Sequence, residues 1–236
     1  KCVNFMKNSD PKAPRTRLNH PVGLVAGGPI RVADFRAVQK MTDHFVAADG
    51  GAAYLLARAT MPDVVYGDMD SLAQPLQVKL GPDRIVRLSE QETTDFDKAL
   101  RHIEAPLILV LGALGGRVDH ELAVFHTLLR HVDKRCLLVG HKDVLFACPA
   151  HVSITLDLRA GDRLSLFPMC ALKGKSEGLD WPIDGLSLDP MVQIGTSNRV
   201  TSGQVRLFFE GAGMLVILPR TRLTSVAKAL MQLLRG

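Results

Sequence analysis

Two aspartates stand two positions apart in the segment Gly67-Asp68-Met69-Asp70-Ser71. In extended backbone this spacing places both side chains on one side of the chain. Carboxylates held together repel each other unless a cation lies between them or one of them takes up a proton. A hard divalent cation such as Mg²⁺ prefers oxygen ligands and brings substrate phosphates with it. A surface turn that satisfies its own backbone is the alternative for an isolated pair of this kind.

Four further polar or glycine-rich segments each follow a predicted strand, as the aspartate pair does. They are residues 27–29 (GGP), 49–52 (DGGA), 91–97 (QETTDFD) and 112–120 (GALGGRVDH). Ligands of an open parallel sheet bind outside the carboxyl ends of its strands, so we expect these segments to meet at one edge of a sheet. Asp49, Asp68, Asp70 and Asp95 would then form an acidic rim suited to Mg²⁺ and a polyphosphate.

Glycines in these segments allow backbone N–H groups to approach phosphate oxygens, because no Cβ stands in the way. Tight turns need the same residues, so each glycine pair alone fits either explanation. Arg117 suits a forked contact with phosphate or a surface ion pair with Asp119. Thr94 and Asp95 would equally serve as caps of the helix that follows them.

Several known signatures are absent from the chain. Neither the Walker A sequence nor G-x-G-x-x-G occurs, so a P-loop or a dinucleotide-binding Rossmann site has no support. The G-x-S-x-G elbow and H-E-x-x-H are also absent, and nothing indicates catalysis by a protein nucleophile.

Alternating apolar strands and helices would position these segments in the first part of the chain. Strands are predicted at 22–26, 44–48, 64–66, 85–88, 107–111 and 135–139, and helices at 32–41, 52–59, 94–103 and 119–131. Wholly apolar strands that alternate with helices are typical of a parallel sheet covered on both faces. We therefore expect an α/β domain with a three-layer parallel sheet over residues 18–142.

From about residue 143 onward, strands follow strands without helices between them. They are predicted at 144–146, 152–158, 163–168, 171–175, 191–194, 204–210 and 214–218. This pattern predicts an antiparallel β-sandwich over residues 143–220. Apolar residues recur at helical spacing from Leu223 to Leu234 and predict a C-terminal packing helix within residues 221–236.

Composition narrows the classes of function. Of 236 residues, 47% are hydrophobic and 22% charged, as in ordinary globular proteins. The longest apolar run, 105–114, is about half a membrane span, and the polar segment 1–17 shows no secretory signal. A net charge of +5 comes without a basic stripe or an aromatic platform, so we expect neither a nucleic-acid nor a membrane partner. Four scattered cysteines fit free thiols in a reducing cytoplasm.

Taken together, the motifs resemble those of the thiamine pyrophosphokinase (thiamin diphosphokinase) family, bacterial type. The matching segments are A-D-G-G-A at 48–52, P-D-x-x-x-G-D-x-D-S at 62–71, E-Q-x-x-T-D-F-x-K-A-L at 90–100, G-x-x-G-G-R-x-D-H at 112–120, S-L-F-P at 165–168, G-L-x-W at 178–181 and G-T-S-N at 195–198. The resemblance covers about residues 22–218 in order. It implies Mg²⁺-dependent transfer of the pyrophosphoryl group of ATP to the thiamine hydroxyl by a cytoplasmic homodimer whose active sites lie at the subunit interface.

The resemblance also implies roles for individual residues. Catalysis would depend on Asp68, Asp70, Asp95 and Arg117, and the metal would be held by Asp49, Asp68, Asp70 and Asp95. ATP would contact Gly28, Asp49, Gly50, Gly51, Ser71, Gly112, Gly115, Gly116, Asp119 and His120. Thiamine would contact Gln91, Trp181, Ser197 and Asn198.

Trp181 also suits thiamine on physical grounds, because tryptophan is the best cation–π face for a cationic aromatic ring. Anchoring a core is the alternative role for this residue, the only tryptophan of the chain. Two positions depart from the family pattern: Ala53 stands where members often have Asn, and Gly195 where some carry Ser.

Two other functions fit parts of the pattern. A metal-dependent nucleotide-sugar transferase also uses D-x-D, but it leaves the G-L-x-W and T-S-N segments unexplained. A non-catalytic nucleotide- or thiamine-binding module would not need the four carboxylates, all of which are present.

Overall fold

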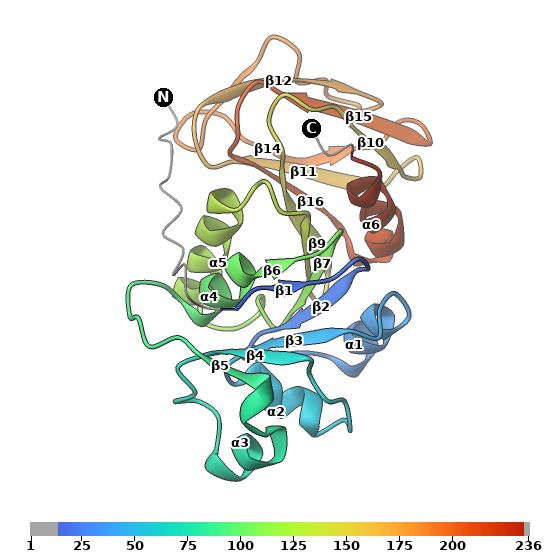
Figure 1. The fold of residues 1–236 in the computed structure, drawn as a ribbon. Helices are drawn as coiled ribbons and strands as arrows, with labels where there is room; N and C mark the ends of the chain where they lie inside the picture. Colours follow the sequence, from blue (N-terminus) through green and yellow to red (C-terminus); the bar gives the residue numbers. More distant parts are fainter. Residues whose placement is uncertain (1–13, 234–236) are drawn as a thin grey trace. The chain divides into compact units, whose positions relative to one another are not determined.

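The computed structural model describes residues 14–233, and its contacts divide them into two compact units, 14–141 and 142–233. Figure 1 shows the helices and strands of each unit. The mixed α/β class expected from the sequence is confirmed. Of the polar segment 1–17, residues 14–17 are described, and Thr16–Arg17 form a short strand, β1, parallel to β6 (Ile103–Glu104).

The first unit is built on parallel strands in the order β8-β7-β2-β3-β4-β5. These strands are β2 (Val22–Val25), β3 (Phe45–Ala48), β4 (Val64–Gly67), β5 (Ile85–Arg87), β7 (Ile108–Leu111) and β8 (Cys136–Val139). Every residue of all but β5 is buried. Because both side-chain directions are shielded from water, such strands need apolar residues throughout, as the sequence has.

The chain runs from β2 through β3 and β4 to β5, then returns to β7 and β8 on the other side of β2. The segments that leave β2 and β7 therefore diverge, and ligands of open sheets bind at such a point. Two glycines meet there: the Gly28 N–H donates to Gly112 O at 2.9 Å. A Cβ on Gly28 would lie 2.4 Å from Gly112 O, and one on Gly112 would lie 2.4 Å from Ala26 O.

The helices of this unit are α1 (Val32–Gln39), α2 (Gly51–Leu56), α3 (Gln74–Leu80), α4 (Asp95–His102) and α5 (Val118–Arg130), with a 3₁₀ helix η1 (Pro82–Arg84). Helix α4 packs on β3, β4 and α5. Its N-cap is Thr94, whose Oγ1 accepts the Asp97 N–H at 3.3 Å. Helix α3 is missing from the sequence prediction because only Leu80 of its residues is buried, which leaves no apolar periodicity to detect.

The second unit contains antiparallel strands in two orders, β14-β11-β16-β9 and β10-β15-β12-β13. The elements are β9 (Asp143–Cys148), β10 (Ile154–Asp157), β11 (Arg163–Pro168), β12 (Leu172–Glu177), β13 (Ser187–Leu188), β14 (Gly195–Arg199), β15 (Gln204–Phe209), β16 (Met214–Pro219), η2 (Arg220–Arg222) and α6 (Leu223–Gln232). Helix α6 packs on β10. Across residues 14–233, none of the helices combines the length and apolar content that crossing a bilayer requires.

The strand predicted at 191–194 is wrong. Met191 and Val192 form a turn and are 90% and 83% exposed, and β14 begins only at Gly195. The turn is closed by Asp189, whose carboxylate accepts the Met191 N–H at 2.7 Å and whose carbonyl accepts the Gln193 N–H at 2.9 Å. An apolar run without a partner strand therefore misled the prediction.

Candidate functional site

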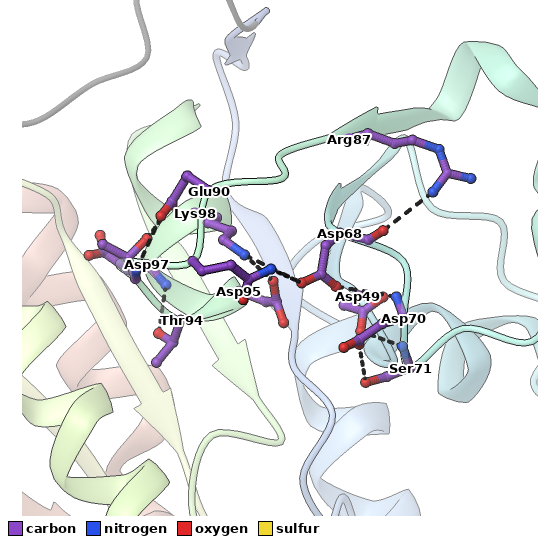
Figure 2. A network of polar contacts seen from close by, with 12 residues as sticks. Asp49, Asp68, Asp70, Ser71, Arg87, Glu90, Thr94, Asp95, Asp97 and Lys98 are labelled. Carbon is purple, nitrogen blue, oxygen red and sulfur yellow. Dashed lines mark hydrogen bonds and ion pairs between the residues drawn. The ribbon is translucent and has the colours of Figure 1, made fainter.

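Three carboxylates from separate elements of the first unit converge (Figure 2). Asp49 follows β3, Asp68 follows β4, and Asp95 is the first residue of α4. One oxygen atom from each lies within 4.8 Å of the other two. We call these three residues the acidic cluster, and its oxygen ligands suit a hard divalent cation.

Asp49 is the most buried member of the acidic cluster, with 2% of its surface exposed. Its Oδ2 accepts the Ser71 N–H at 3.1 Å, whereas the buried Oδ1 has no hydrogen-bond partner among the described residues. Burial raises the pKa of Asp49, and the charges of Asp95 and Asp70 raise it further against the hydrogen bond from Ser71. A buried oxygen without a partner is costly, so a cation at Oδ1 fits this site.

Asp68 is held by donors on both oxygens. The Asp70 N–H donates to Oδ1 at 3.2 Å, and Gln91 Nε2 donates to Oδ2 at 3.3 Å. The Asp70 N–H is the main cause of a lowered pKa for Asp68, and Gln91 and the charge of Lys98 act in the same direction. Asp68 is therefore ionised at neutral pH.

Asp70, the second residue of the D-x-D pair, is not a member of the acidic cluster. Its carboxylate accepts the Ser71 hydroxyl at 2.9 Å. Met69 has a φ of 70°, and the Asp70 N–H turns back onto Asp68. The expectation of extended backbone between the two aspartates is wrong, because this segment is a turn.

Lys98 contacts the acidic cluster, but it is absent from the predicted site residues. Its Nζ lies 3.1 Å from Asp95 Oδ1 and 3.8 Å from Asp68 Oδ2, and its side chain is 2% exposed. Its position three residues after Asp95 in a predicted helix was the available signal, since residues at this spacing are neighbours on a helix surface.

A second buried carboxylate, Asp97, lies two residues further along α4. Its Oδ2 accepts a hydrogen bond from the Arg130 guanidinium at 2.8 Å, and His131 Nε2 lies 2.7 Å from its Oδ1. Burial alone would raise the pKa of Asp97, but the hydrogen bond with His131 and the charge of Arg130 outweigh burial and lower it. This carboxylate is fully paired and links α4 to α5.

The predicted phosphate loop at 112–120 is occupied by the chain's own groups. Glu121 Oε1 accepts the N–H groups of Gly115 and Gly116 at 2.5 and 3.1 Å. These N–H groups therefore do hold an anion, but it is an internal carboxylate.

Arg117 forms its ion pair with Asp119, the alternative that the sequence left open. The two contacts are 3.1 Å and 2.5 Å long, and both side chains are mostly exposed. The His120 N–H also donates to Asp119, at 3.0 Å.

Packing accounts for several of the predicted ATP-binding glycines. The Gly28 N–H is already bonded to Gly112 O. A Cβ on Gly51 would lie 2.0 Å from Val25 O, so α2 packs on β2 only with glycine here. At Gly50 the closest atom would be Ser71 Cβ at 3.5 Å, an ordinary contact, and packing does not require this glycine.

The predicted thiamine contacts Trp181, Ser197 and Asn198 lie in the second unit. Trp181 is 60% exposed, so its alternative role as a core anchor is wrong. The side-chain amide of Asn198 holds the backbone of Trp181, because it accepts the Trp181 N–H at 3.2 Å and donates to Trp181 O at 2.6 Å. The guanidinium carbon of Arg199 lies 6.0 Å from the ring centroid. The Ser197 N–H donates to Ser165 Oγ at 3.0 Å.

A protein-family comparison bears directly on the acidic cluster. The model described as "Thiamin pyrophosphokinase, catalytic domain" matches residues 35–139. This stretch contains Asp49, Asp68 and Asp95. Over these residues the chain is similar to the catalytic domain of thiamin pyrophosphokinases.

Individual thiamin pyrophosphokinases extend the match beyond this stretch. Thiamine pyrophosphokinase 1 of Oryza sativa subsp. japonica is 33% identical over 163 residues, which are 62% of each chain. Thiamin pyrophosphokinase 1 of Caenorhabditis elegans is 28% identical over 181 residues, 69% of this chain and 73% of that protein. The chain thus spans somewhat less than two thirds of the rice relative.

Solved structures of thiamin pyrophosphokinases have a similar fold. The enzyme from Geobacillus thermodenitrificans is 26% identical with a TM-score of 0.70, over 84% of this chain and 96% of that one. The one from Candida albicans has a TM-score of 0.72 at 17% identity, over 87% and 93% of the two chains; at this identity the likeness concerns the fold alone.

Proposed function

We propose that this protein is a thiamine pyrophosphokinase, which transfers the pyrophosphoryl group of ATP to the hydroxyl of thiamine and releases AMP. The acidic cluster carries this proposal. Its three carboxylates lie within 4.8 Å of one another, and one of them has a buried oxygen without a partner in residues 14–233. All three lie in the segment that matches the family's catalytic domain.

Mg²⁺ would be held by Asp49, Asp68 and Asp95, and Asp49 Oδ1 is the ligand atom for which the described part of the chain offers no other partner. The family resemblance assigns Asp70 to the same metal. Once bound, Mg²⁺ neutralises phosphate charge and orients the triphosphate.

The thiamine hydroxyl oxygen would attack the β-phosphorus of ATP directly. A new oxygen–phosphorus bond forms, the bond between the β-phosphorus and the oxygen shared with the α-phosphate breaks, and AMP leaves with that oxygen. The hydroxyl proton passes to a carboxylate, and Asp95 would either accept this proton or hold the metal. Arg117 and the N–H groups of Gly115 and Gly116 would steady phosphate oxygens after release from Asp119 and Glu121.

The wider arrangement is proposed from the family resemblance. Residues 18–142 would form a three-layer ATP- and Mg²⁺-binding domain, and 143–220 a β-sandwich that binds thiamine and another subunit. The remaining ATP contacts would be Gly28, Gly50, Gly51, Ser71, Gly112 and His120, and thiamine would contact Gln91, Trp181, Ser197 and Asn198. We propose a cytoplasmic homodimer with its active sites at the subunit interface.

The direct test is to incubate the full chain with ATP, Mg²⁺ and thiamine and to quantify AMP and thiamine diphosphate together. Equal amounts are expected, and none in EDTA. ADP in place of AMP would show transfer of one phosphoryl group, and AMP without thiamine diphosphate would show hydrolysis; both contradict the proposal. Isolation of a phosphoenzyme would contradict direct attack.

The acceptor is tested through Trp181. Because the ring is exposed, Trp181→Ala should leave stability within about 0.5 kcal/mol and raise the KM for thiamine about tenfold through loss of a cation–π contact. The KM for ATP should not change. Equal changes in both KM values would contradict a thiamine-specific contact.

A further inference from the structure

We propose that Lys98 is a built-in counter-cation of the acidic cluster. Its ammonium group keeps the carboxylates together in the metal-free protein and reduces the net negative charge of the cluster to what one divalent cation neutralises. This inference rests on the proposed function in one respect only, the assignment of a divalent cation to these carboxylates.

One ammonium group bridges two separate elements of the fold. Lys98 Nζ lies 3.1 Å from Asp95 Oδ1, one turn earlier on α4, and 3.8 Å from Asp68 Oδ2, which follows β4. Figure 2 shows its amino group directed at these two carboxylates. Lys98 therefore connects the start of the helix to the end of the strand through charge.

Burial argues against a direct contact between Lys98 and a nucleotide. Only 2% of the side chain is exposed, so its ammonium reaches a dissolved phosphate only if the cluster opens. Lysines that bind phosphates act as accessible point charges. The ammonium group of Lys98 instead compensates the charges of Asp68 and Asp95 inside the protein.

The charges leave room for one divalent cation. With each carboxyl group counted as −1 and the Lys98 ammonium as +1, the formal charge of the cluster is −2, which a single Mg²⁺ would neutralise. No ion pair with Lys98 involves Asp49 among the described residues, and Asp49 Oδ1 is without a partner. Lys98 thus compensates two carboxylates and leaves the third for the metal.

Removing the charge of Lys98 should have two effects of opposite sign. Without metal, the carboxylates repel each other with less compensation, so the protein loses stability. A divalent cation, however, is no longer repelled by a neighbouring ammonium and binds more tightly. A lysine that mattered for packing alone would lower stability equally with and without metal.

The first experiment measures thermal unfolding of the full chain in EDTA and in saturating Mg²⁺. Lys98→Met should lower Tm by about 10 °C in EDTA, and Mg²⁺ should restore at least half of that loss through linkage. Lys98→Arg, which keeps the charge, should respond to Mg²⁺ as the wild type does. Lys79→Met removes an exposed lysine of α3 and is the matched control, with no change expected.

The second experiment measures Mn²⁺ binding by the loss of the free-ion EPR signal. Lys98→Met should bind Mn²⁺ about tenfold more tightly than the wild type. Weaker binding, or the same fall in Tm with and without Mg²⁺, would overturn the proposal.

A double variant covers the case in which Lys98→Met does not fold. Asp95→Asn with Lys98→Met restores the formal charge of the wild-type cluster and should fold in EDTA; if it also fails, Lys98 is needed for packing and the proposal is overturned. These measurements contain neither ATP nor thiamine, so a protein that makes no AMP can still support the counter-cation. A wild type without any response to Mg²⁺ or Mn²⁺ overturns it.

Discussion

Asp95 and Asp97 stand two residues apart on one helix, yet they belong to clusters of opposite character. Asp97 is paired with both Arg130 and His131 at hydrogen-bonding distance. Asp95 shares one lysine with Asp68, and in the same cluster Asp49 Oδ1 has no hydrogen-bond partner within residues 14–233. Asp49 and Asp97 are both almost fully buried, so the burial of a single carboxylate does not distinguish the clusters. Charge balance distinguishes them: the balanced cluster links α4 to α5, and the acidic cluster keeps an excess of carboxylates over cations.

The helix itself explains how the two clusters remain separate. Successive residues of an α-helix are about 100° apart, so residues at i and i+2 face nearly opposite directions. Thr94 caps α4 and fixes where it begins, which sets the direction of both carboxylates. A single helix thus contributes one carboxylate to each cluster.

The largest effect is expected from Asp49→Asn. This substitution keeps the shape of the side chain but removes the charge at the unpartnered oxygen, so turnover should fall by about 10²–10³-fold or more, the size of losing a group that stabilises transition-state charge. Stability in EDTA should stay equal or rise, because a buried charge is gone. Turnover is measured by AMP release, and stability in EDTA by thermal unfolding. Turnover within threefold of the wild type would remove Asp49 from the metal site.

Whereas Asp49→Asn mainly lowers turnover, Asp97→Asn should mainly lower stability. It leaves Arg130 and His131 without their carboxylate, which should cost about 3–5 kcal/mol of unfolding free energy in urea titrations. The loss should be the same in EDTA and in Mg²⁺, because Asp97 is not part of the acidic cluster. A Mg²⁺-dependent loss would mean that the two clusters are coupled and do not act independently.

A smaller effect is expected on the pH dependence of the unfolding free energy, to which Asp97 contributes in acid. The pKa of Asp97 is lower in the folded protein than its usual value, so the unfolded state binds the proton more tightly. The stability that Asp97 contributes is complete above its unfolded pKa and is lost as pH falls through the lower folded pKa. Unfolding free energies measured from pH 6 down to pH 2 should therefore fall less steeply for Asp97→Asn than for the wild type. Parallel curves would show that Asp97 has no such role.

The smallest effect is expected at the shared helix cap. Thr94→Ala removes the acceptor of the Asp97 N–H and should cost about 1 kcal/mol of stability, with Thr94→Ser close to the wild type. The rise in Tm on adding Mg²⁺ should not change. If that rise disappears while stability is kept, the cap positions Asp95 rather than the helix as a whole.

Much of this fold could be predicted because its signals are local. Strands β2 and β7 are continuous apolar runs ended by glycine, and the predicted boundaries differ from the observed ones by one residue. The convergence of Asp49 and Asp68 followed from the rule that parallel strands end at a common edge.

Other features depended on tertiary contacts that the sequence does not display. A lysine in a helix usually points to solvent, and Lys98 is buried only because α4 packs on β3 and β4. Met191 and Val192 have strand-like composition but no partner strand. The carboxylate that takes the N–H groups of Gly115 and Gly116 comes from the following helix, and only the folded loop shows this.

The contact between Gly28 and Gly112 also limits how this protein can change over generations. The atom that a new Cβ on Gly28 would strike is a backbone carbonyl oxygen, which all twenty amino acids possess. No exchange of a neighbouring side chain can make room for it, so a larger residue here has no single-step compensation. The atom nearest to a new Cβ on Gly112 is likewise a backbone oxygen, that of Ala26, so directed-evolution libraries should spare both positions.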